Sequence, residues 1–541
     1  MSRALLINPS YFRTYGSNEG GIAFPVYPVL SLAVLAAEAE ARGHEVEILD
    51  LSYRSYDPDE VARVVRRLRP DVVGITATTP LANQMRDISY VVKDVSPHIL
   101  TVGGGAHATA LPAETLRESI LDFVAVGEGD HVIADLLDGR PPSEIPGLHW
   151  RDGPRIVANP PAPLVDDLDD LPMPLWERYP LDGNARVTRI ISRYRPITTV
   201  EFSRGCIYKC DFCASKNTMG RGYRKKSPKR CADELERLVA LGFREVTLVD
   251  DIFTTDNAWA SAVCEEIIRR KIKIAWTCNN GIRVDSANLE LFQLMKRAGC
   301  YRVYFGFESG NDAVMKAFGK GGRASLEKGV AAVDLAHEAG LEPNGFFLVG
   351  LTGDDEASMQ DTIDYAKRVR LDTMKCGICV PFPGTPMFAE LHQAGRIKSF
   401  DWDSYTVYNE AEALFDHPTL SWAEIKGAFR RFYVEAFLRN PAYLWRRLRF
   451  VLRNHEVFWN IYYTMKFWAM VRGRHREVTP ERYAHEATWR ALDLQLDQPV
   501  APVEPLIVRR HRTAGPRSVP VSGSGSAPAP RPGGARHERP G

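Results

Sequence analysis

Apolar and polar positions along the first part of the chain switch repeatedly between a strand-like and a helix-like pattern. Short apolar runs alternate with longer segments whose apolar residues recur every three or four positions. The first kind predicts buried strands and the second predicts helices. The predicted strands are 4–8, 45–51, 71–76, 99–102 and 123–126, and the predicted helices are 27–41, 59–68, 81–95 and 112–119. This alternation predicts a doubly wound, Rossmann-like α/β sheet with its ligand beyond the carboxyl ends of the strands.

The same alternation resumes after residue 196 and continues for about two hundred residues. Predicted strands lie at 198–202, 245–249, 273–278, 301–307 and 342–349, and predicted helices lie at 228–240, 256–270, 286–298, 326–339 and 359–369. Repeated strand–helix units of this size predict a partial (β/α)6 barrel. In such barrels, functional residues stand at the carboxyl ends of the strands.

Changes in composition mark the segments between and after these two regions. Prolines and an acidic run fill 138–195, which predicts a linker with short β pieces. A helical region with interleaved arginines and aromatics follows 396, and after 495 the chain is rich in Pro, Ala, Ser, Gly and Arg, which predicts disorder. The predicted domains are 1–140 (Rossmann-like), 141–195 (linker), 196–395 (barrel core), 396–495 (helical region) and 496–541 (disordered tail).

Overall composition narrows the function only slightly. The formal net charge of +1 gives no reason to expect a nucleic-acid partner, and 45% hydrophobic residues are ordinary for a globular protein. The sequence contains no window of about eighteen uninterrupted apolar residues, so we expect no transmembrane helix. The chain runs directly into a strand pattern, so we expect no signal peptide, and its nine cysteines form no paired framework. We therefore expect a cytoplasmic protein.

The strongest chemical signal is a group of three closely spaced cysteines after the predicted strand 198–202. They are Cys206, Cys210 and Cys213, at Cys-x-x-x-Cys-x-x-Cys spacing. Such a group of thiolates favours an iron–sulfur cluster, and because the next cysteine is Cys231, one iron of a 4Fe–4S cluster would be free to bind another molecule. The alternatives are a zinc knuckle without its fourth ligand, or three unrelated buried thiols. We interpret the second pair, Cys376 and Cys379, as buried strand residues.

With the aromatic Phe212 before its third cysteine, this motif resembles the signature of the radical S-adenosylmethionine (SAM) enzymes. The resemblance implies that the open iron binds SAM and that an electron cleaves SAM to a 5′-deoxyadenosyl radical. The protein then supplies the positioned cluster and a dry pocket, while the cofactors carry the chemistry. It also implies an electron donor such as flavodoxin or ferredoxin.

The same resemblance assigns roles to residues at the ends of the predicted barrel strands. Asp250 and Asp251 stand where the family contacts the methionyl ammonium of SAM, and a carboxylate there would pair with a cation in a desolvated cleft. Because neighbours on an extended chain point to opposite sides, we expect only one of them to make this contact. Glu308 and Ser309 are expected near the ribose or methionyl group, and Gly350 beneath the adenine. Arg283 and Arg302 are interpreted as structural rather than as SAM ligands.

The N-terminal region carries two loops that follow predicted strands, Thr76 to Pro80 and Gly103 to Thr109. Glycines in the second loop let a ligand approach the backbone, although a tight turn would explain them equally well. Together with residues 28–51 and 126–130, these loops resemble the cobalamin-binding domains fused in front of radical SAM cores. The residues implied to bind cobalamin are Thr76, Thr78, Gly103, Gly104 and Gly105. Because no Asp-x-His-x-x-Gly motif is present, the resemblance implies base-off cobalamin without a histidine ligand, and we expect His107 to bond backbone instead.

Taken together, the resemblance implies a cobalamin-dependent radical SAM methyltransferase. It would use SAM both as methyl source and as radical source, and would act on an unactivated carbon or a phosphinate phosphorus of a small, secondary-metabolite type molecule. Three alternatives stay open: a cyclase or ring-rearranging enzyme of the same branch, a methylthiotransferase, and a non-catalytic cobalamin or iron–sulfur sensor. A methylthiotransferase would need three more clustered cysteines before Cys206, and the sequence has none there. The basic, aromatic C-terminal helices are expected to cap the barrel or to contact a membrane surface or an apolar substrate.

Overall fold

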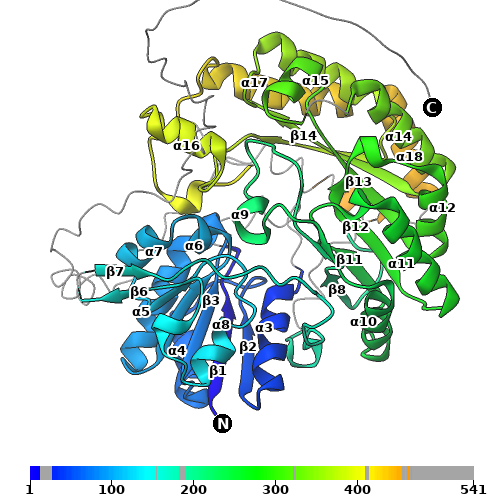
Figure 1. The fold of residues 1–541 in the computed structure, drawn as a ribbon. Coiled ribbons are helices and arrows are strands. Elements are labelled where there is room, and N and C mark those ends of the chain that lie inside the picture. The colour runs from blue at the N-terminus through cyan, green and yellow to red at the C-terminus, as the bar shows by residue number, and fades with distance from the viewer. Residues whose placement is uncertain are drawn as a thin grey trace, which may run out of the picture. The chain divides into compact units, whose positions relative to one another are not determined.

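The structure is a computed structural model. It describes residues 1–12, 27–153, 155–181, 191–320, 324–407, 414–453, 457–458, 461–462 and 465. Figure 1 shows two α/β sheets, the N-terminal one in blue and the second in green. Both were predicted from the alternation of strand and helix patterns, and the predicted fold class is confirmed.

The N-terminal sheet has the strand order β2-β1-β3-β4-β5-β6-β7, with β1 to β5 parallel. Its parallel strands are β1 (Arg3–Asn8), β2 (Glu45–Asp50), β3 (Val72–Thr76), β4 (Leu100–Gly104) and β5 (Phe123–Ala125). In this doubly wound order the crevice for a ligand opens where the connections change direction, between β1 and β3.

Helices cover both faces of this sheet, as a parallel sheet requires. They are α3 (Leu30–Ala41), α4 (Pro58–Leu68), α5 (Ala82–Val95), α6 (Ala106–Ala110), α7 (Pro112–Glu118) and α8 (Val132–Leu137). The alternation along β1 divides the core: Leu6 packs with residues of α3 and α8, whereas Leu5 packs with residues of α4 and α5. The continuous apolar run of the first strand is therefore explained by burial on both sides.

The predicted linker contains a hairpin that extends the N-terminal sheet. β6 (Leu148–Asp152) pairs antiparallel with β5, and β7 (Arg155–Ala158) pairs antiparallel with β6. The short β pieces expected in this segment are present, but they belong to the first sheet rather than standing between two domains. The sheet is consequently mixed at one edge.

The second sheet is a row of six parallel strands in the order β15-β14-β13-β12-β11-β8. The strands are β8 (Ile197–Val200), β11 (Glu245–Leu248), β12 (Ala275–Ile282), β13 (Cys300–Glu308), β14 (Glu342–Val349) and β15 (Thr373–Ile378). Side chains alternate between the interior, where the hydroxyls of Thr247 and Thr277 lie 3.0 Å apart, and the apolar layer under the helices, which holds Phe305 and Phe347. This is the open (β/α)6 barrel that the sequence predicts.

The barrel helices begin at capping residues that the sequence supplies. They are α10 (Pro228–Ala240), α11 (Asn257–Arg269), α12 (Leu289–Arg297), α13 (Asp312–Ala317), α14 (Leu326–Glu338) and α15 (Glu356–Arg368). The Asp256 carboxylate accepts a hydrogen bond from the backbone N–H of Trp259, 3.1 Å away, so the predicted cap of α11 is confirmed. Ser227 caps α10 in the same way.

Helices continue beyond the barrel, where a helical region is predicted. They are α16 (Pro386–Gln393), α17 (Trp422–Phe432), a π-helix labelled η9 (Tyr433–Leu438) and α18 (Pro441–Arg453), with the short 3-10 turn η7 (Trp402–Ser404) after α16. Within the described ranges, no helix is long and apolar enough to span a membrane. The predicted disordered tail, 496–541, lies outside the described residues, and the predicted domain boundaries stay predictions.

Candidate functional site

The three clustered cysteines lie in a loop, residues 205–223, whose base is closed by a short antiparallel ladder. β9 (Ser203–Arg204) leads into this cysteine loop, and β10 (Arg224–Lys225) leads out of it. Gly205 opens the loop with φ +90°, and a Cβ atom there would collide with the carbonyl oxygen of Gly222. Only glycine fits this position, so the Arg-Gly-Cys sequence fixes how the chain enters the loop.

The cysteines of this loop differ from the other six in their exposure. Cys206, Cys210 and Cys213 are half-buried, whereas all other cysteines are buried. The backbone N–H of Cys213 donates to the carbonyl of Cys210 at 3.3 Å, which turns the two side chains around one bend. Phe212 packs edge-on against Phe318 with ring centroids 5.4 Å apart, and this contact anchors the loop to the barrel.

These three thiols fit a 4Fe–4S cluster better than a single metal ion. Among the described residues, no three His, Cys, Asp or Glu side chains converge on one ion position. A four-iron cluster does not require such convergence, because each thiolate binds a different iron. Burial raises the pKa of all three thiols, that of Cys210 to about 12, so the thiolates need the positive charge of bound iron.

The two aspartates after β11 have different surroundings. Asp250 is 3% exposed, and both of its oxygens are bonded: Oδ1 accepts from the N–H of Phe202 at 2.8 Å and Oδ2 accepts from the hydroxyl of Ser203. Burial raises its pKa to about 8. Asp251 accepts from the hydroxyl of Ser215 through Oδ1 at 2.6 Å, but its buried Oδ2 meets no hydrogen-bond donor in the described part of the chain. The unsatisfied oxygen of Asp251 therefore fits an incoming ammonium group.

Glu308 and Ser309, at the end of β13, also differ. Glu308 has a φ of +58°, which is unusual for a residue with a side chain. It forms an ion pair with Lys320, and its negative charge lies close enough to Cys210 to raise the pKa of that thiol. Ser309 is fully buried, and its hydroxyl accepts from the N–H of Asn311 and lies 3.4 Å from the hydroxyl of Thr362. Glu308 thus lies beside the cysteine loop, whereas Ser309 is held within the helix layer.

The remaining barrel candidates have structural surroundings. Gly350 follows β14 with φ +74°, a conformation that favours glycine. The Arg283 guanidinium lies 3.6 Å from the ring centroid of Tyr208, a residue of the cysteine loop. Arg302 is buried at the amino end of the barrel, where it pairs with Glu342 at 3.0 Å. Arg283 supports the loop, and Arg302 belongs to the barrel floor.

A cavity of about 390 Å³ lies beyond the carboxyl ends of the N-terminal strands. Thr76, Gly104 and Gly105 line it, and Gly104 leaves open space where a Cβ would stand. Thr78 and Gly103 do not line it, and a Cβ on Gly103 would meet Leu121 and Met85 in the helix layer. The position and the glycine wall fit a bulky cofactor such as cobalamin, bound where doubly wound sheets bind ligands.

The wall opposite these glycines comes from the barrel, and sequence reasoning did not assign its members. They are Glu201, Arg204, Thr218, Met219 and Val249. Two of them, Thr218 and Met219, lie in the helix α9 (Ser215–Met219) of the cysteine loop, and Val249 adjoins Asp250. In Figure 1, α9 stands between the blue and green parts of the fold. The cavity therefore joins the predicted cobalamin wall to the surroundings of the cysteine loop.

A larger cavity of about 800 Å³ lies elsewhere, between α4, α5 and β6. Its lining includes Leu100 and Phe123, which begin β4 and β5. It therefore opens near the amino ends of the strands, opposite the edge where doubly wound sheets bind ligands. Its greater size does not make it the better candidate for a cofactor.

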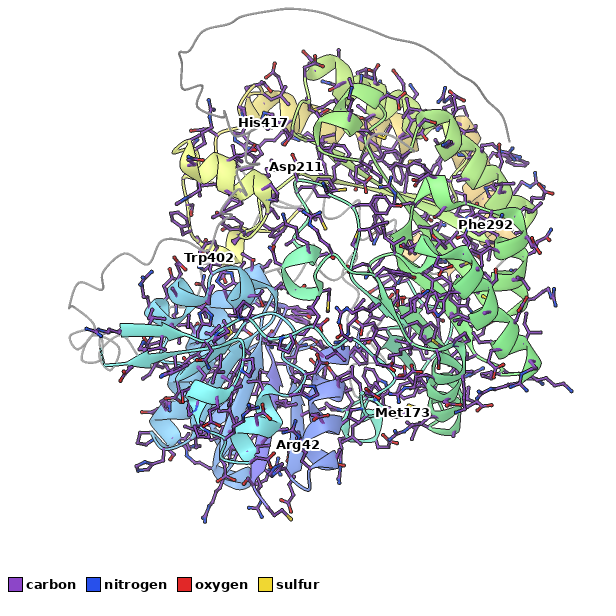
Figure 2. All side chains as sticks on the ribbon, viewed as in Figure 1. Arg42, Met173, Asp211, Phe292, Trp402 and His417 are labelled. Carbon is purple, nitrogen blue, oxygen red and sulfur yellow. The ribbon has the colours of Figure 1, made fainter. Side chains whose placement is uncertain are left out.

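His107 is buried in α6, outside the 390 Å³ cavity. Its Nδ1 lies 3.4 Å from the Thr79 hydroxyl, and its ring meets that of Trp402 edge-on at 4.9 Å. Burial lowers its pKa to about 4. The Trp402 indole N–H also donates to Glu118 at 3.2 Å, and Figure 2 shows Trp402 where the segment after α16 meets the N-terminal domain. His107 thus bonds a side chain, not the backbone partner that we expected.

Base-off cobalamin without a histidine ligand stays a prediction. We expect the electron paramagnetic resonance spectrum of the Co(II) form to lack nitrogen splitting from a protein imidazole, because His107 does not line the cavity. The spectrum of the His107→Ala protein should match it. A splitting that disappears in that variant would contradict the prediction.

Comparisons with known proteins match both parts of the fold. The Radical SAM superfamily profile matches residues 200–366, and the B12 binding domain profile matches residues 23–137. An uncharacterized methyltransferase from Pyrococcus horikoshii is 30% identical over 422 residues, covering 76% of this chain and 88% of that protein. An anaerobic magnesium-protoporphyrin IX monomethyl ester cyclase from Rubrivivax gelatinosus is 28% identical over 461 residues, covering 81% of this chain and 79% of that protein.

The fold also matches a solved structure over most of the chain. The radical S-adenosylmethionine methyltransferase TsrM from Kitasatospora setae, with tryptophan and a SAM analogue bound, aligns with a TM-score of 0.60. The match covers 74% of this chain and 77% of TsrM, at 21% sequence identity. At that identity, the likeness concerns the fold.

Proposed function

Because the chain belongs to the cobalamin-dependent radical SAM enzymes, we propose that it is a methyltransferase acting on a small molecule. The methyl acceptor in this proposal is an unactivated carbon or a phosphinate phosphorus. When bound, the 4Fe–4S cluster supplies the electron that cleaves SAM, and cobalamin supplies a carrier for the methyl group.

One observation carries this proposal: the 390 Å³ cavity has walls from both domains. Its N-terminal wall includes Gly104 and Gly105, and its barrel wall includes Met219 of the cysteine loop. Methyl transfer through cobalamin needs both cofactors to open onto one space. A protein that only transferred electrons through a cluster, or only carried cobalamin, would not need such a shared space.

The chain's own residues would hold and orient the reactants. Cys206, Cys210 and Cys213 would bind three irons, and the open Oδ2 of Asp251 would accept hydrogen bonds from the methionyl ammonium of SAM. The glycines at the ends of β4 and β5 would let a large ring approach the backbone. Apolar residues of α3, Leu32 and Leu35, line the cavity and would exclude water from reactive species.

The proposal is tested by the products of SAM in the full-length protein, reconstituted anaerobically with iron, sulfide and cobalamin. With a reductant present, we expect 5′-deoxyadenosine, together with S-adenosylhomocysteine that forms only when cobalamin is bound. A cyclase or ring-rearranging enzyme would give no cobalamin-dependent S-adenosylhomocysteine, and a sensor would give neither product. Either result would contradict the methyltransferase proposal, and the first would favour the alternative that the Rubrivivax relative represents.

The same proposal includes a low-potential electron donor such as flavodoxin or ferredoxin. It also includes a reducing cytoplasm, which would keep the six cysteines outside the cysteine loop as free thiols. Replacing the chemical reductant by reduced flavodoxin should sustain 5′-deoxyadenosine formation. If neither flavodoxin nor ferredoxin sustains it, that partner is wrong.

The exposed side of α18 fits an anionic lipid surface. Its outward residues include Leu444, Trp445 and Leu448, exposed by 46%, 61% and 49%. The stretch 436–453 holds five arginines and no acidic residue, and the exposed Arg439 and Arg449 complement anionic headgroups. We expect the protein to sediment with vesicles containing phosphatidylglycerol, but not with neutral vesicles, and Trp445→Glu to weaken this binding. Self-association in place of vesicle binding would assign this face to a subunit contact.

A further inference from the structure

Two arginines stand directly opposite each other at the base of the cysteine loop. Arg204 of β9 and Arg224 of β10 are register partners in the two-stranded ladder. Like charges in such cross-strand positions destabilise a ladder. The ladder closes the loop that carries all three candidate cluster ligands, so its stability bears directly on where those thiols lie.

Two of the three opposing carboxylates come from one loop of the N-terminal domain, the loop that follows β5. Asp130 receives two hydrogen bonds from Arg204, at 2.9 and 3.0 Å, and Glu128 receives two from Arg224, at 2.5 and 2.9 Å. Glu201, at the end of β8, accepts a further bond from Arg204 at 2.7 Å. In the pairs Arg204–Asp130 and Arg224–Glu128, the planar guanidinium donates one hydrogen bond to each carboxylate oxygen. This is the geometry in which such bonds are strongest.

The ion pairs are shielded from water. The side chains of Arg204 and Asp130 are 6% and 7% exposed, and those of Arg224 and Glu128 are 10% and 3% exposed. Removing one partner of a buried pair leaves an uncompensated charge, so the ladder depends on the N-terminal loop being in place. Surface ion pairs would exert no comparable constraint.

The same side chains form part of the cavity wall. Glu128, Asp130 and Arg204 line the 390 Å³ cavity together with Gly127 and Gly129 of the loop after β5. Cobalamin bound in this cavity would contact the loop after β5, whose carboxylates hold the ladder in place. SAM bound at the cluster would depend on the cysteine loop, which the ladder closes. Both cobalamin and SAM are therefore expected to bind more tightly when the ion pairs are formed.

We propose that Glu128, Asp130, Arg204 and Arg224 are positioning residues that couple cobalamin binding to SAM binding at the cluster. The inference rests on the two-cofactor assignment of the proposed function. Coupling of this kind is reciprocal: cobalamin strengthens SAM binding by the same factor by which SAM strengthens cobalamin binding. Such factors typically lie at about 5 to 150-fold.

The test measures binding rather than turnover. In the full-length protein with an oxidised cluster, which does not cleave SAM, the dissociation constant of SAM is measured with and without cobalamin, and that of cobalamin with and without SAM. For the natural chain we expect at least a fivefold strengthening in both directions. In Glu128→Gln and Asp130→Asn, which keep the side-chain shape, and in Arg204→Lys, which keeps the charge, we expect less than about twofold.

A matched control is the exposed ion pair between Arg237 of α10 and Glu177 of the linker, 2.6 Å long, with side chains 34% and 36% exposed. Arg237→Lys should leave the coupling factor unchanged. Coupling that persists in folded Glu128→Gln and Asp130→Asn, or that is absent from the natural chain, would overturn the inference. If the natural chain bound no cobalamin, the proposed function itself would fail.

Discussion

A protein in which Cys206, Cys210 and Cys213 are all replaced by alanine should contain no 4Fe–4S cluster and should not cleave SAM. The three thiols are half-buried in one loop, and the described cysteines outside it are buried in the core, where none can replace a lost ligand. Since the cluster is both the electron carrier and the SAM-binding metal, loss of its ligands removes the activity completely, not by degrees. Absorbance, iron content and 5′-deoxyadenosine formation after anaerobic reconstitution measure these effects.

The control for this experiment is the second cysteine pair, Cys376 and Cys379. Both are buried, and Cys379 lies against the sulfur of Met387 at 3.7 Å, which is the packing of an apolar residue. Replacing both by alanine should leave the cluster spectrum and its iron content unchanged. An intact cluster in the triple variant, or a lost cluster in the double variant, would mean that the ligands have been assigned wrongly.

Asp251→Asn should weaken SAM binding about ten- to a hundredfold while leaving the cluster absorbance intact. The carboxylate has one bonded oxygen and one buried oxygen that meets no donor in the described chain, so an ammonium group can form a charge-assisted bond there. Losing such a bond costs about 1.5–3 kcal/mol, which corresponds to this range of affinities. Equilibrium binding of SAM to the cluster-loaded protein measures the effect.

Asp250→Asn is the matched comparison, because it alters the neighbouring carboxylate in the same way. Both oxygens of Asp250 are already bonded to Phe202 and Ser203, so this variant should lower the thermal stability and change the SAM dissociation constant by less than about threefold. The reverse pattern would move the SAM contact to Asp250. If neither variant shifts the affinity, both aspartates merely form the turn after β11.

Local sequence patterns predicted those structural features that depend only on residues close together in the sequence. The spacing of Cys206, Cys210 and Cys213 lies within one loop, and the strand and helix periods lie within single elements, so the sequence contains all that is needed to predict them. Asp256 as the cap of α11 is predictable for the same reason.

Contacts between residues far apart in the sequence could not be predicted from local patterns. The hairpin of β6 and β7 looks like part of a linker until its pairing with β5 is known, because strand pairing is a long-range property. Gly103 and Gly104 are adjacent and identical, yet one faces the helix layer and the other the cavity. The ion pair of Arg204 with Asp130 joins residues 74 positions apart, and no local pattern indicates it.

The contact of Trp402 with His107 and Glu118 has a consequence for synthesis of the protein. Its hydrogen bond joins residues 284 positions apart in the sequence. Domains generally fold in order as they leave the ribosome, so the N-terminal sheet can form while the barrel is still being made. The part of this surface that Trp402 covers, at His107 and Glu118, stays uncovered until the segment after α16 emerges. The contact of η7 with the N-terminal domain therefore forms only after all six barrel strands have been synthesised, whereas the ion pairs of Arg204 and Arg224 can form earlier.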